Sequence, residues 1–447
     1  MGRRSHSRSL SIWSNGVRVG QWTIPARGDM QLQYDKTWVQ SSIGRPLSLS
    51  LPFNFENLPH KGEKVLNYFD NLLPDSDSIR KRIATRFKTT SVDPFDLLMA
   101  IGRDCVGAVQ LLGEDEEPAD YEQVHGTPLS SAQIEQRLNE ASTGTGFAAA
   151  REDDADFRIS LAGAQEKTAF LWWGDKWQLP HGATPTTHIF KMPIGLVGGR
   201  KADFSTSVDN EWLCLRFLKA YGLPVAEAEI HTFGAQRVLV VERFDRRVHA
   251  SGQWIMRLPQ EDFCQVEGVS PLHKYENDGG PGLQALFKTL RQSENAEQDM
   301  RTMMAAQLVF WLLGAPDGHA KNFSVHILPG GRFKLTKLYD VMSAYPVMGD
   351  GPNQWSPVEI KMAMALLGKN RHYHMHNILR RHFNSTARKV GYADNAEPII
   401  ESILQRTNAA IEEVNTNLPA GFNRQVADTI LDGVSIAAKK LAAMPAS

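Results

Sequence analysis

The spacing of apolar residues changes twice along the chain, and these changes divide it into three regions. In the first, two short alternating runs at 10–13 and 17–22 flank Asn15-Gly16, a pair that strongly favours a β-hairpin. Apolar segments preceded by helix-capping residues predict short helices at 67–73, 78–87 and 93–101. The acidic run 114–120 predicts a solvated loop or linker. Residues 1–125 are therefore assigned to an N-terminal module.

Strand-like patterns dominate the second region. Alternating or continuous apolar runs predict strands at 168–173, 176–179, 186–191 and 237–241. Residues 210–221 have apolar side chains at helical spacing and stop before Gly222, which predicts one helix among these strands. Residues 126–245 are assigned to a sheet lobe.

Helix-like patterns dominate the third region, which is assigned to residues 246–447. Helices are predicted at 284–290, 301–313, 358–366, 374–383, 396–414 and 423–441. The exception is an alternating stretch at 332–339, which could be a strand. A mixed lobe followed by a helical lobe places a cleft between the two.

Composition excludes several classes of protein. With 42% hydrophobic and 22% charged residues, the 447-residue chain can bury large cores. Its 49 basic and 50 acidic residues argue against coating nucleic acid through bulk charge. Three widely spaced cysteines indicate neither a disulfide framework nor a zinc site. Since no apolar run is long enough to cross a membrane, we expect a cytoplasmic protein.

The most informative motif is Asp317-Gly-His-Ala-Lys-Asn322, hereafter the catalytic loop, with Asp340 eighteen residues further on. Phosphoryl transfer requires a carboxylate that orients the attacking hydroxyl, an oxygen ligand for a metal, and a second carboxylate that bridges metal and phosphates. Asp317 and Asn322 have the spacing of the first two groups in kinases. An Asp-Gly turn with an Asn five residues on also arises by chance.

The nucleotide half of such a site has candidates in the sheet lobe. Small residues within 160–167 would let backbone N–H groups approach phosphate oxygens, although a simple β-turn explains them as well. Residues 162–167 are hereafter the phosphate loop, and Ser160 lies just before it. Lys191 ends a predicted strand, and Glu211 begins the helix that follows, as either a lysine-holding carboxylate or a charge favoured by the helix dipole. Residues 242–244 pass between the lobes, where backbone atoms would meet an adenine edge. Arg243, Arg246 and Arg247 could instead form a solvated patch.

Together these motifs resemble the HipA family, the serine/threonine-kinase toxins of bacterial type II toxin-antitoxin systems. The likeness spans nearly the whole chain and is carried by residues 45–52, 69–75, 159–167, 184–191, 207–211, 241–246, 258–262, 278–282, 317–324 and 338–340.

The resemblance implies an α+β, two-lobed kinase-like fold related to lipid and aminoglycoside kinases, with an added N-terminal module and an all-helical C-terminal lobe. It implies that Asp317 is the catalytic base and that Asn322 and Asp340 hold Mg²⁺. The ATP contacts that it implies are Ala162, Gly163, Ala164, Gln165, Glu166, Lys167, Lys191, Glu242, Arg243, Phe244, His319, Lys321, Asn322, Tyr339 and Asp340.

Regulation and partners are also implied by the resemblance. Ser160 would be an autophosphorylation site, and a phosphate there would repel ATP. The partner would be HipB, a dimeric helix-turn-helix antitoxin, and the pair would repress its own operon on operator DNA, at the nucleoid. The family's best-known target is glutamate-tRNA ligase, but the residues do not identify the target of this chain.

A basic stripe at 360–393 contains no acidic residue. An antitoxin could place such a stripe beside DNA phosphates, and the candidate contacts are Lys369, Arg371, Arg380 and Arg381. A solvent-facing basic helix explains the stripe equally well. His372, His374 and His376 lack the spacing and the companion ligands of a metal site, and we predict none.

Two other functions are compatible with parts of the sequence. The chain could be a non-catalytic corepressor of an antitoxin–DNA complex, although Asp317, Asn322, Asp340 and Lys191 argue against lost catalysis. It could also be a small-molecule kinase of the aminoglycoside type, but no sequence signal marks a substrate pocket for one.

Overall fold

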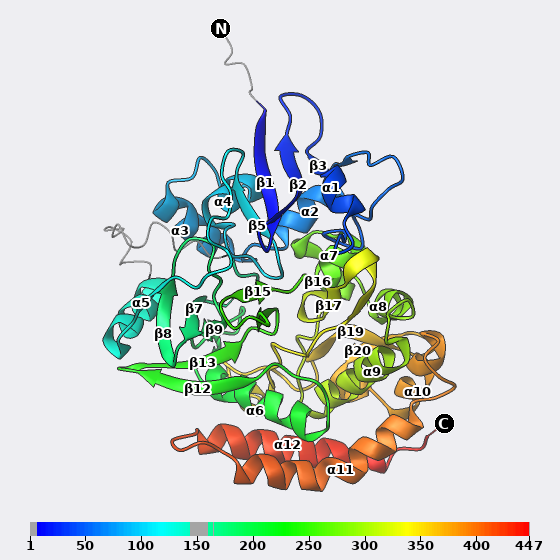
Figure 1. Cartoon of the computed structure of the whole chain (residues 1–447). Coiled ribbons are helices and arrows are strands. Elements are labelled where there is room, and N and C mark those ends of the chain that lie inside the picture. The colour runs from blue at the N-terminus through cyan, green and yellow to red at the C-terminus, as the bar shows by residue number, and fades with distance from the viewer. Residues whose placement is uncertain (1–6, 144–159, 164, 447) are drawn as a thin grey trace.

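The computed structural model of the chain describes residues 7–143, 160–163 and 165–446. Its elements follow one another through the molecule, with the N-terminal module at the top of Figure 1 and the last two helices at the bottom. Within the described ranges, no helix combines the length and apolar character needed to cross a bilayer.

The N-terminal module is a five-stranded antiparallel sheet in the order β4-β3-β2-β1-β5, covered by short helices. Asn15 and Gly16 both have positive φ angles, of 47° and 79°, which gives the predicted hairpin a tight turn with the twist of its strands. Trp22 stacks on Phe69 at 3.9 Å between ring centroids, so the helices close the sheet with an aromatic core. The elements are β1 Arg8–Ser14, β2 Val17–Ile24, β3 Gln31–Tyr34, β4 His60–Lys61, β5 Gln110–Gly113, α1 Lys36–Gln40, α2 Glu63–Asp70, α3 Asp77–Phe87 and α4 Pro94–Ile101.

A six-stranded antiparallel sheet in the order β12-β13-β9-β7-β8-β6 forms the middle of the molecule. Helix α5 packs on this sheet, and α6 joins it to the helices below (Figure 1). The strands predicted in this region and its helix are present, within a few residues of their predicted bounds. The elements are β6 Gly126–Pro128, β7 Lys167–Trp173, β8 Lys176–Pro180, β9 His188–Lys191, β12 Ala228–Phe233, β13 Gln236–Glu242, α5 Ser131–Thr143 and α6 Ser207–Ala220, with the small ribbons β10 Gly195–Val197, β11 Ala202–Phe204, β14 Arg246–Val248 and β15 Ile255–Arg257.

The C-terminal region is not all-helical, and this part of the prediction is wrong. The apolar run predicted as a helix at 358–366 is instead strand β19, Lys361–Leu367, paired with β20, Arg371–His374. A short apolar run buried on both faces has no helical period, so its sequence does not distinguish strand from helix. The predicted helix 374–383 begins only at Arg380, after a single 3₁₀ turn at Met375–Asn377.

A second small sheet, β16-β17-β18, lies beside the catalytic loop. The alternating stretch 332–339 contributes only β18 to it. The remaining predicted helices are present. The elements are β16 Gln260–Asp262, β17 Ser324–Ile327, β18 Phe333–Leu335, α7 Phe263–Glu267, α8 Leu283–Leu290, α9 Ala296–Leu312, α10 Arg380–Lys389, α11 Glu397–Thr416 and α12 Arg424–Ala442.

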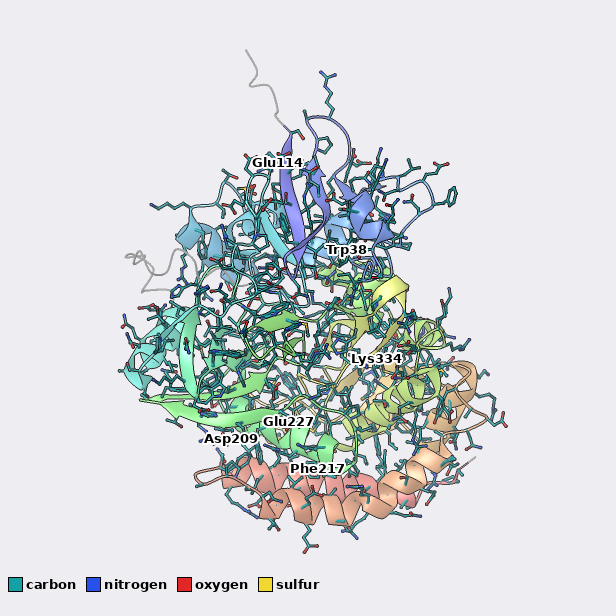
Figure 2. The ribbon with its side chains drawn as sticks, in the orientation of Figure 1. Trp38, Glu114, Asp209, Phe217, Glu227 and Lys334 are labelled. Atoms are coloured by element: carbon teal, nitrogen blue, oxygen red, sulfur yellow. The ribbon has the colours of Figure 1, made fainter. Side chains whose placement is uncertain are left out.

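The largest hydrophobic core joins the sheet lobe to the C-terminal region. Helix α6 is buried on nearly all sides, and Figure 2 shows its fully buried Phe217 just above α11 and α12. Residues of α6, α9, α11 and α12 belong to one continuous cluster. The two lobes therefore share a core across one side of the cleft, which holds them at a defined spacing.

A buried carboxyl links the N-terminal module to β16. Oε1 of Glu261, which is fully buried, accepts a hydrogen bond from the Leu49 backbone N–H at 2.8 Å. Burial raises the pKa of Glu261 from an ordinary value of 4.5 to about 8. The folded protein thus keeps a proton on Glu261 at pH values where the unfolded chain has released it.

We expect this group to make the protein less stable as pH rises. The contribution of Glu261 to the free energy of unfolding is complete below pH 4.5 and is lost as pH rises toward 8. Between these pH values only the folded state holds the proton, so each rise in pH favours the unfolded state. Glu261→Gln, which is neutral at every pH, should remove this slope, measured by denaturant unfolding at several pH values. The exposed Glu412→Gln serves as control; a Glu261→Gln variant that kept the wild-type slope would contradict the assignment.

Candidate active site

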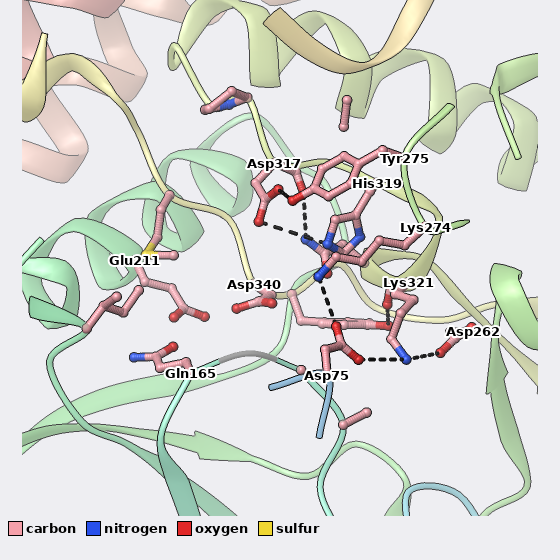
Figure 3. A pocket seen from close by; sticks show the side chains of 18 of the residues that line it. Asp75, Gln165, Glu211, Asp262, Lys274, Tyr275, Asp317, His319, Lys321 and Asp340 are labelled. Carbon is pink, nitrogen blue, oxygen red and sulfur yellow. Dashed lines mark hydrogen bonds and ion pairs between the residues drawn. The ribbon is translucent and has the colours of Figure 1, made fainter. Parts of the chain in front are cut away.

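A cavity of about 950 Å³ opens between the middle sheet and the C-terminal region. All three regions of the chain line it. The N-terminal module contributes Asn71 and Asp75, the sheet lobe Lys191 and Glu211, and the C-terminal region the catalytic loop and Asp340. Figure 3 shows Asp75, Glu211, Asp317 and Asp340 converging from these three regions.

Helix α9 delivers the catalytic loop to this cavity. The helix stays buried to its end, and Gly314, at φ +60°, turns the chain toward Asp317. Nδ2 of Asn322 donates to the Asp317 backbone carbonyl at 2.7 Å, which closes the loop. The Asp317 side chain is 49% exposed, and its Oδ1 accepts a hydrogen bond from the Tyr275 hydroxyl at 2.6 Å.

His319 stands next to the Asp317 carboxylate. Its Nε2 lies 3.9 Å from Asp317 Oδ2, beyond hydrogen-bond distance. Burial lowers the pKa of His319, so its imidazole is mainly neutral at pH 7. Its Nδ1 has no hydrogen-bond partner among the described residues, and the side chain lines the cavity.

The central interaction of the site is made by Lys191, at the end of β9. Its Nζ lies 2.7 Å from Oε1 of Glu211 and 2.5 Å from Oδ1 of Asp340. Burial alone would lower the pKa of Lys191, but the carboxylates of Asp340 and Glu211 raise it above its ordinary value. Lys191 therefore stays charged. The structure brings Lys191, Glu211 and Asp340 together as the sequence predicts, although they are up to 149 residues apart.

Asp340 has an uncommon backbone conformation, with φ +60°. Asp tolerates the left-handed region better than most residues, and such conformations concentrate at functional sites. Burial would raise the pKa of the Asp340 carboxyl, but Lys191 and Lys167 hold it well below the ordinary range. Asp340 therefore carries a negative charge at every physiological pH.

The phosphate loop passes over the same cavity. At Gly163, φ is +107°, a backbone conformation that glycine adopts without strain and other residues rarely adopt. Lys167 faces Lys191 directly across strands β7 and β9, and burial followed by this like charge lowers the pKa of Lys167 to about 8. Lys167 and Lys191 are thus paired across two strands, and both line the cavity. Ala162, Gln165 and Lys167 line the cavity, whereas Ala164 lies outside the described residues.

Three predicted ATP contacts, Glu166, Lys321 and Arg243, have charged side chains that are paired with other residues. The Glu166 side chain pairs with Arg82 of α3. The Lys321 ammonium lies among Asn71, Asp75 and Asp262, so it does not present a free charge to the cavity.

The Arg243 guanidinium is buried in ion pairs with Asp104 and Asp245, and Arg246 joins the same network. The prediction of a solvated patch is therefore wrong for both arginines. Arg243 can offer the cavity only its backbone.

An aromatic wall completes the predicted adenine end. The rings of Phe244 and Tyr339 lie 5.7 Å apart, and both residues line the cavity together with the apolar side chains of Ile189, Val241 and Leu215. The Tyr339 hydroxyl is engaged with Ser324 and the Lys321 carbonyl, so the cavity meets its ring. A flat, largely apolar group suits this end.

The residues present fit Mg²⁺. Asn322 uses its amide nitrogen to hold the loop, which leaves its side-chain oxygen free for a cation, and Asp340 supplies a permanently charged carboxylate. Mg²⁺ prefers such oxygen ligands and takes the rest of its shell from water and phosphates.

Two family descriptions match the chain. The HipA-like C-terminal domain matches residues 159–411, and the HipA N-terminal domain matches residues 10–112. This chain belongs to the HipA family.

Similar proteins extend the HipA assignment. The chain is 36% identical over 345 residues to the putative kinase Y4mE of Sinorhizobium fredii, covering 76% of this chain and 78% of that protein. It is 26% identical over 370 residues to the serine/threonine-protein kinase toxin HipA of Shewanella oneidensis, covering 80% and 78%. The fold matches HipA in the solved complex of Shewanella oneidensis HipA, HipB and operator DNA, with a TM-score of 0.78, 21% identity and coverage of 97% and 98%. The predicted HipA family, kinase-like α+β fold and kinase class are confirmed.

The four DNA-contact candidates of this HipA chain differ in exposure. Lys369, Arg371 and Arg381 are exposed, although Arg371 lies 3.2 Å from Glu276. Arg380 is 7% exposed, and Glu397 and Glu401 hold its guanidinium. The prediction that Arg380 is free to contact DNA is therefore wrong. Acids of the next helix, α11, neutralise its charge, and they lie outside the basic stripe from which the prediction was made.

Several HipA site residues had no role in the sequence prediction. Asn71, Asp75, Asp262, Lys274 and Tyr275 all line the cavity, but they come from short loops and a short strand distant in sequence from the catalytic loop. The available signal was the recurrence of segments 69–75 and 258–262 among the HipA-like motifs. That signal indicates importance without indicating where the side chains meet.

We expect Glu211→Gln to weaken nucleotide binding. Without that charge, Lys191 pairs only with Asp340 and is no longer held toward the phosphates, so ATP affinity should fall by about tenfold. The measurement is the increase in unfolding temperature on adding Mg-ATP, which should shrink relative to wild type. Asp209→Asn is the matched control, since Asp209 lies two residues away on α6 (Figure 2) and pairs with Arg237. Equal increases for wild type and Glu211→Gln would contradict the role of Glu211.

Proposed function

We propose that this HipA-family chain is a Mg²⁺- and ATP-dependent protein serine/threonine kinase and the toxin of a type II toxin-antitoxin system. The observation that supports this best is the Lys191 ammonium held between Glu211 and Asp340 in the cavity that also contains Asp317. A corepressor without catalysis would need neither this buried pairing nor the exposed carboxylate beside it.

Each side chain has a distinct task in this proposal. Asp317 orients the hydroxyl of the target serine or threonine and accepts its proton. Lys191 and Lys167 bind phosphate oxygens, and the aromatic wall of Phe244 and Tyr339 takes the adenine. Asn322 and Asp340 hold Mg²⁺, which offsets phosphate charge when bound.

Tyr275 affects access to the proposed base. Its hydroxyl donates to Asp317 Oδ1, while Nε2 of the mainly neutral His319 lies 3.9 Å from Oδ2, beyond hydrogen-bond distance. The hydrogen bond fixes the orientation of the carboxylate, so one oxygen remains for the substrate hydroxyl.

Autophosphorylation at Ser160 is part of the proposal. Ser160 is fully buried, and its Oγ donates to the Leu72 carbonyl at 2.7 Å. Phosphate transfer to the Ser160 hydroxyl therefore requires the phosphate loop to move, so that Ser160 is no longer buried. The added phosphate brings roughly two negative charges that do not fit the buried site, so the loop could not return and the modified protein would be inactive.

The proposed partners are a HipB-like helix-turn-helix antitoxin dimer and, through it, operator DNA, in the bacterial cytoplasm and at the nucleoid. The support is the fold shared with a HipA whose solved complex contains HipB and operator DNA. The proposed substrate is a translation-linked protein, with glutamate-tRNA ligase as the first candidate to test.

Kinase activity is tested by incubating the protein with Mg-ATP and mapping phosphopeptides. We expect phosphate on Ser160, reduced by at least about 100-fold in Asp317→Ala, because a general base contributes that much. Asp428→Ala, which alters an exposed carboxylate on α12, is the control. Absence of phosphate incorporation with any divalent metal would favour the corepressor function.

The exposed basic residues give a separate test of the DNA contact. In the complex with antitoxin and operator DNA, Lys369→Ala and Arg381→Ala should each lower the salt dependence of affinity by about one counterion. Lys439→Ala, at an exposed position on α12, should leave it unchanged. Arg380→Ala should instead lower the unfolding temperature, because it leaves Glu397 and Glu401 without their partner. An unchanged salt slope in both test variants would remove these residues from the DNA interface.

A further inference from the structure

The N-terminal module enters the active site through one short segment, residues 71–75, between α2 and α3. Asn71, Leu72 and Asp75 line the cavity. Figure 3 shows Asp75 beside Lys274 and Lys321, with Asp262 on the far side of Lys321. Segment 71–75 thus lies against the catalytic loop and the phosphate loop at once.

The first contact of segment 71–75 is with the catalytic loop. Lys321 Nζ donates to Asn71 Oδ1 at 2.9 Å and to the Asn71 carbonyl at 3.2 Å, and it lies 3.4 Å from Asp75 Oδ1. Lys321 directly precedes Asn322, whose side chain closes the loop onto the Asp317 carbonyl. A single peptide bond therefore separates Lys321, which contacts segment 71–75, from Asn322, which closes the catalytic loop.

A second contact reaches Asp317 from the other side. Asp75 Oδ2 accepts from Lys274 Nζ at 2.9 Å. Lys274 directly precedes Tyr275, whose hydroxyl donates to Asp317 Oδ1. The two oxygens of the Asp75 carboxylate thus bind two lysines. Each lysine directly precedes a residue that is hydrogen-bonded to Asp317.

The backbone of the same segment holds the phosphate loop. The Asp75 N–H donates to the Gly163 carbonyl at 3.0 Å, and Pro74 and Gly163 form a β-bridge. The Leu72 carbonyl accepts from Ser160 Oγ. Segment 71–75 therefore fixes the distance between the loop expected over the phosphates and the loop that carries the base.

Charge makes the Asp75 side chain difficult to replace. Its side chain is 12% exposed, and the Lys321 side chain is 4% exposed. Burial would raise the pKa of Asp75, but Lys321 and Lys274 lower it below its ordinary value, so the carboxylate is charged. An amide of the same shape would keep hydrogen-bonding capacity but leave two ammonium groups facing each other with less compensation.

We propose that Asp75 is a positioning residue of the phosphotransfer site, through which the N-terminal module holds the catalytic loop and the phosphate loop in register. This inference rests on the proposed kinase function. It makes the N-terminal module part of the active site, since Asp317 is oriented only when Asp75 holds Lys274 and Lys321.

The test compares Asp75→Asn with wild type and with Asp35→Asn, a carboxylate of the same module that pairs with Arg18 away from the cavity. At saturating Mg-ATP, the transfer rate of Asp75→Asn should fall by at least about tenfold, because misorientation penalises the reacting geometry. The dissociation constant for ATP should stay within about threefold, since the nucleotide contacts remain. Asp35→Asn should match wild type in both measurements.

A second readout does not depend on catalysis. Amide hydrogen exchange in peptides covering 317–322 should become faster in Asp75→Asn and not in Asp35→Asn. If Asp75→Asn fails to fold, Lys274→Met removes only the contact on the Tyr275 side, at a side chain that is 16% exposed, and should lower the transfer rate without changing ATP affinity.

The outcomes separate the two proposals. Wild-type rate and wild-type exchange in Asp75→Asn would overturn the positioning role, as would a loss confined to ATP affinity. If wild type itself transfers no phosphate, the kinase proposal fails, and the exchange measurement still decides whether Asp75 positions the catalytic loop.

Discussion

The site depends on one constraint: a buried positive charge must be paired. Lys191 is 6% exposed, and its ammonium is balanced by carboxylates from α6 and from the stretch that follows β18. Removing both partners would leave an uncompensated charge in a low-dielectric interior, at a cost of several kcal/mol. The pairing therefore ties the middle sheet to the C-terminal region at the point where the cavity forms.

The same principle explains the joint between the N-terminal module and the rest of the chain. Asp104 and Asp245 form a buried network of ion pairs with Arg243, Arg246 and Arg257. Around the cavity, Asp75 and Asp262 compensate Lys321. Each regional boundary is thus crossed by ion pairs, so the regions are held at a defined orientation and not merely linked by the chain.

Local chemistry accounts for the elements that were predicted correctly. Asn15-Gly16 has the backbone freedom that a tight hairpin needs. Helices α11 and α12 have long, clear amphipathic periods. Strand β19 was predicted as a helix because its run is apolar on both sides, and its pairing with β20 is made by residues outside the run.

By itself, the sequence determined the chemical parts of the site: Asp317, Asn322, Asp340, Lys191 and Glu211 were predicted from spacing and from likeness to the HipA motifs. The tertiary structure decided the direction of each remaining charge. Arg243 is paired with Asp104 from the N-terminal module as well as with Asp245, and Arg380 is paired with acids of the next helix. Lys321 lines the cavity, but Asp75 and Asp262 pair with its charge. The reason is physical: whether a charged side chain meets solvent, ligand or a partner depends on burial and on groups brought near by folding, and neither is a property of the local sequence.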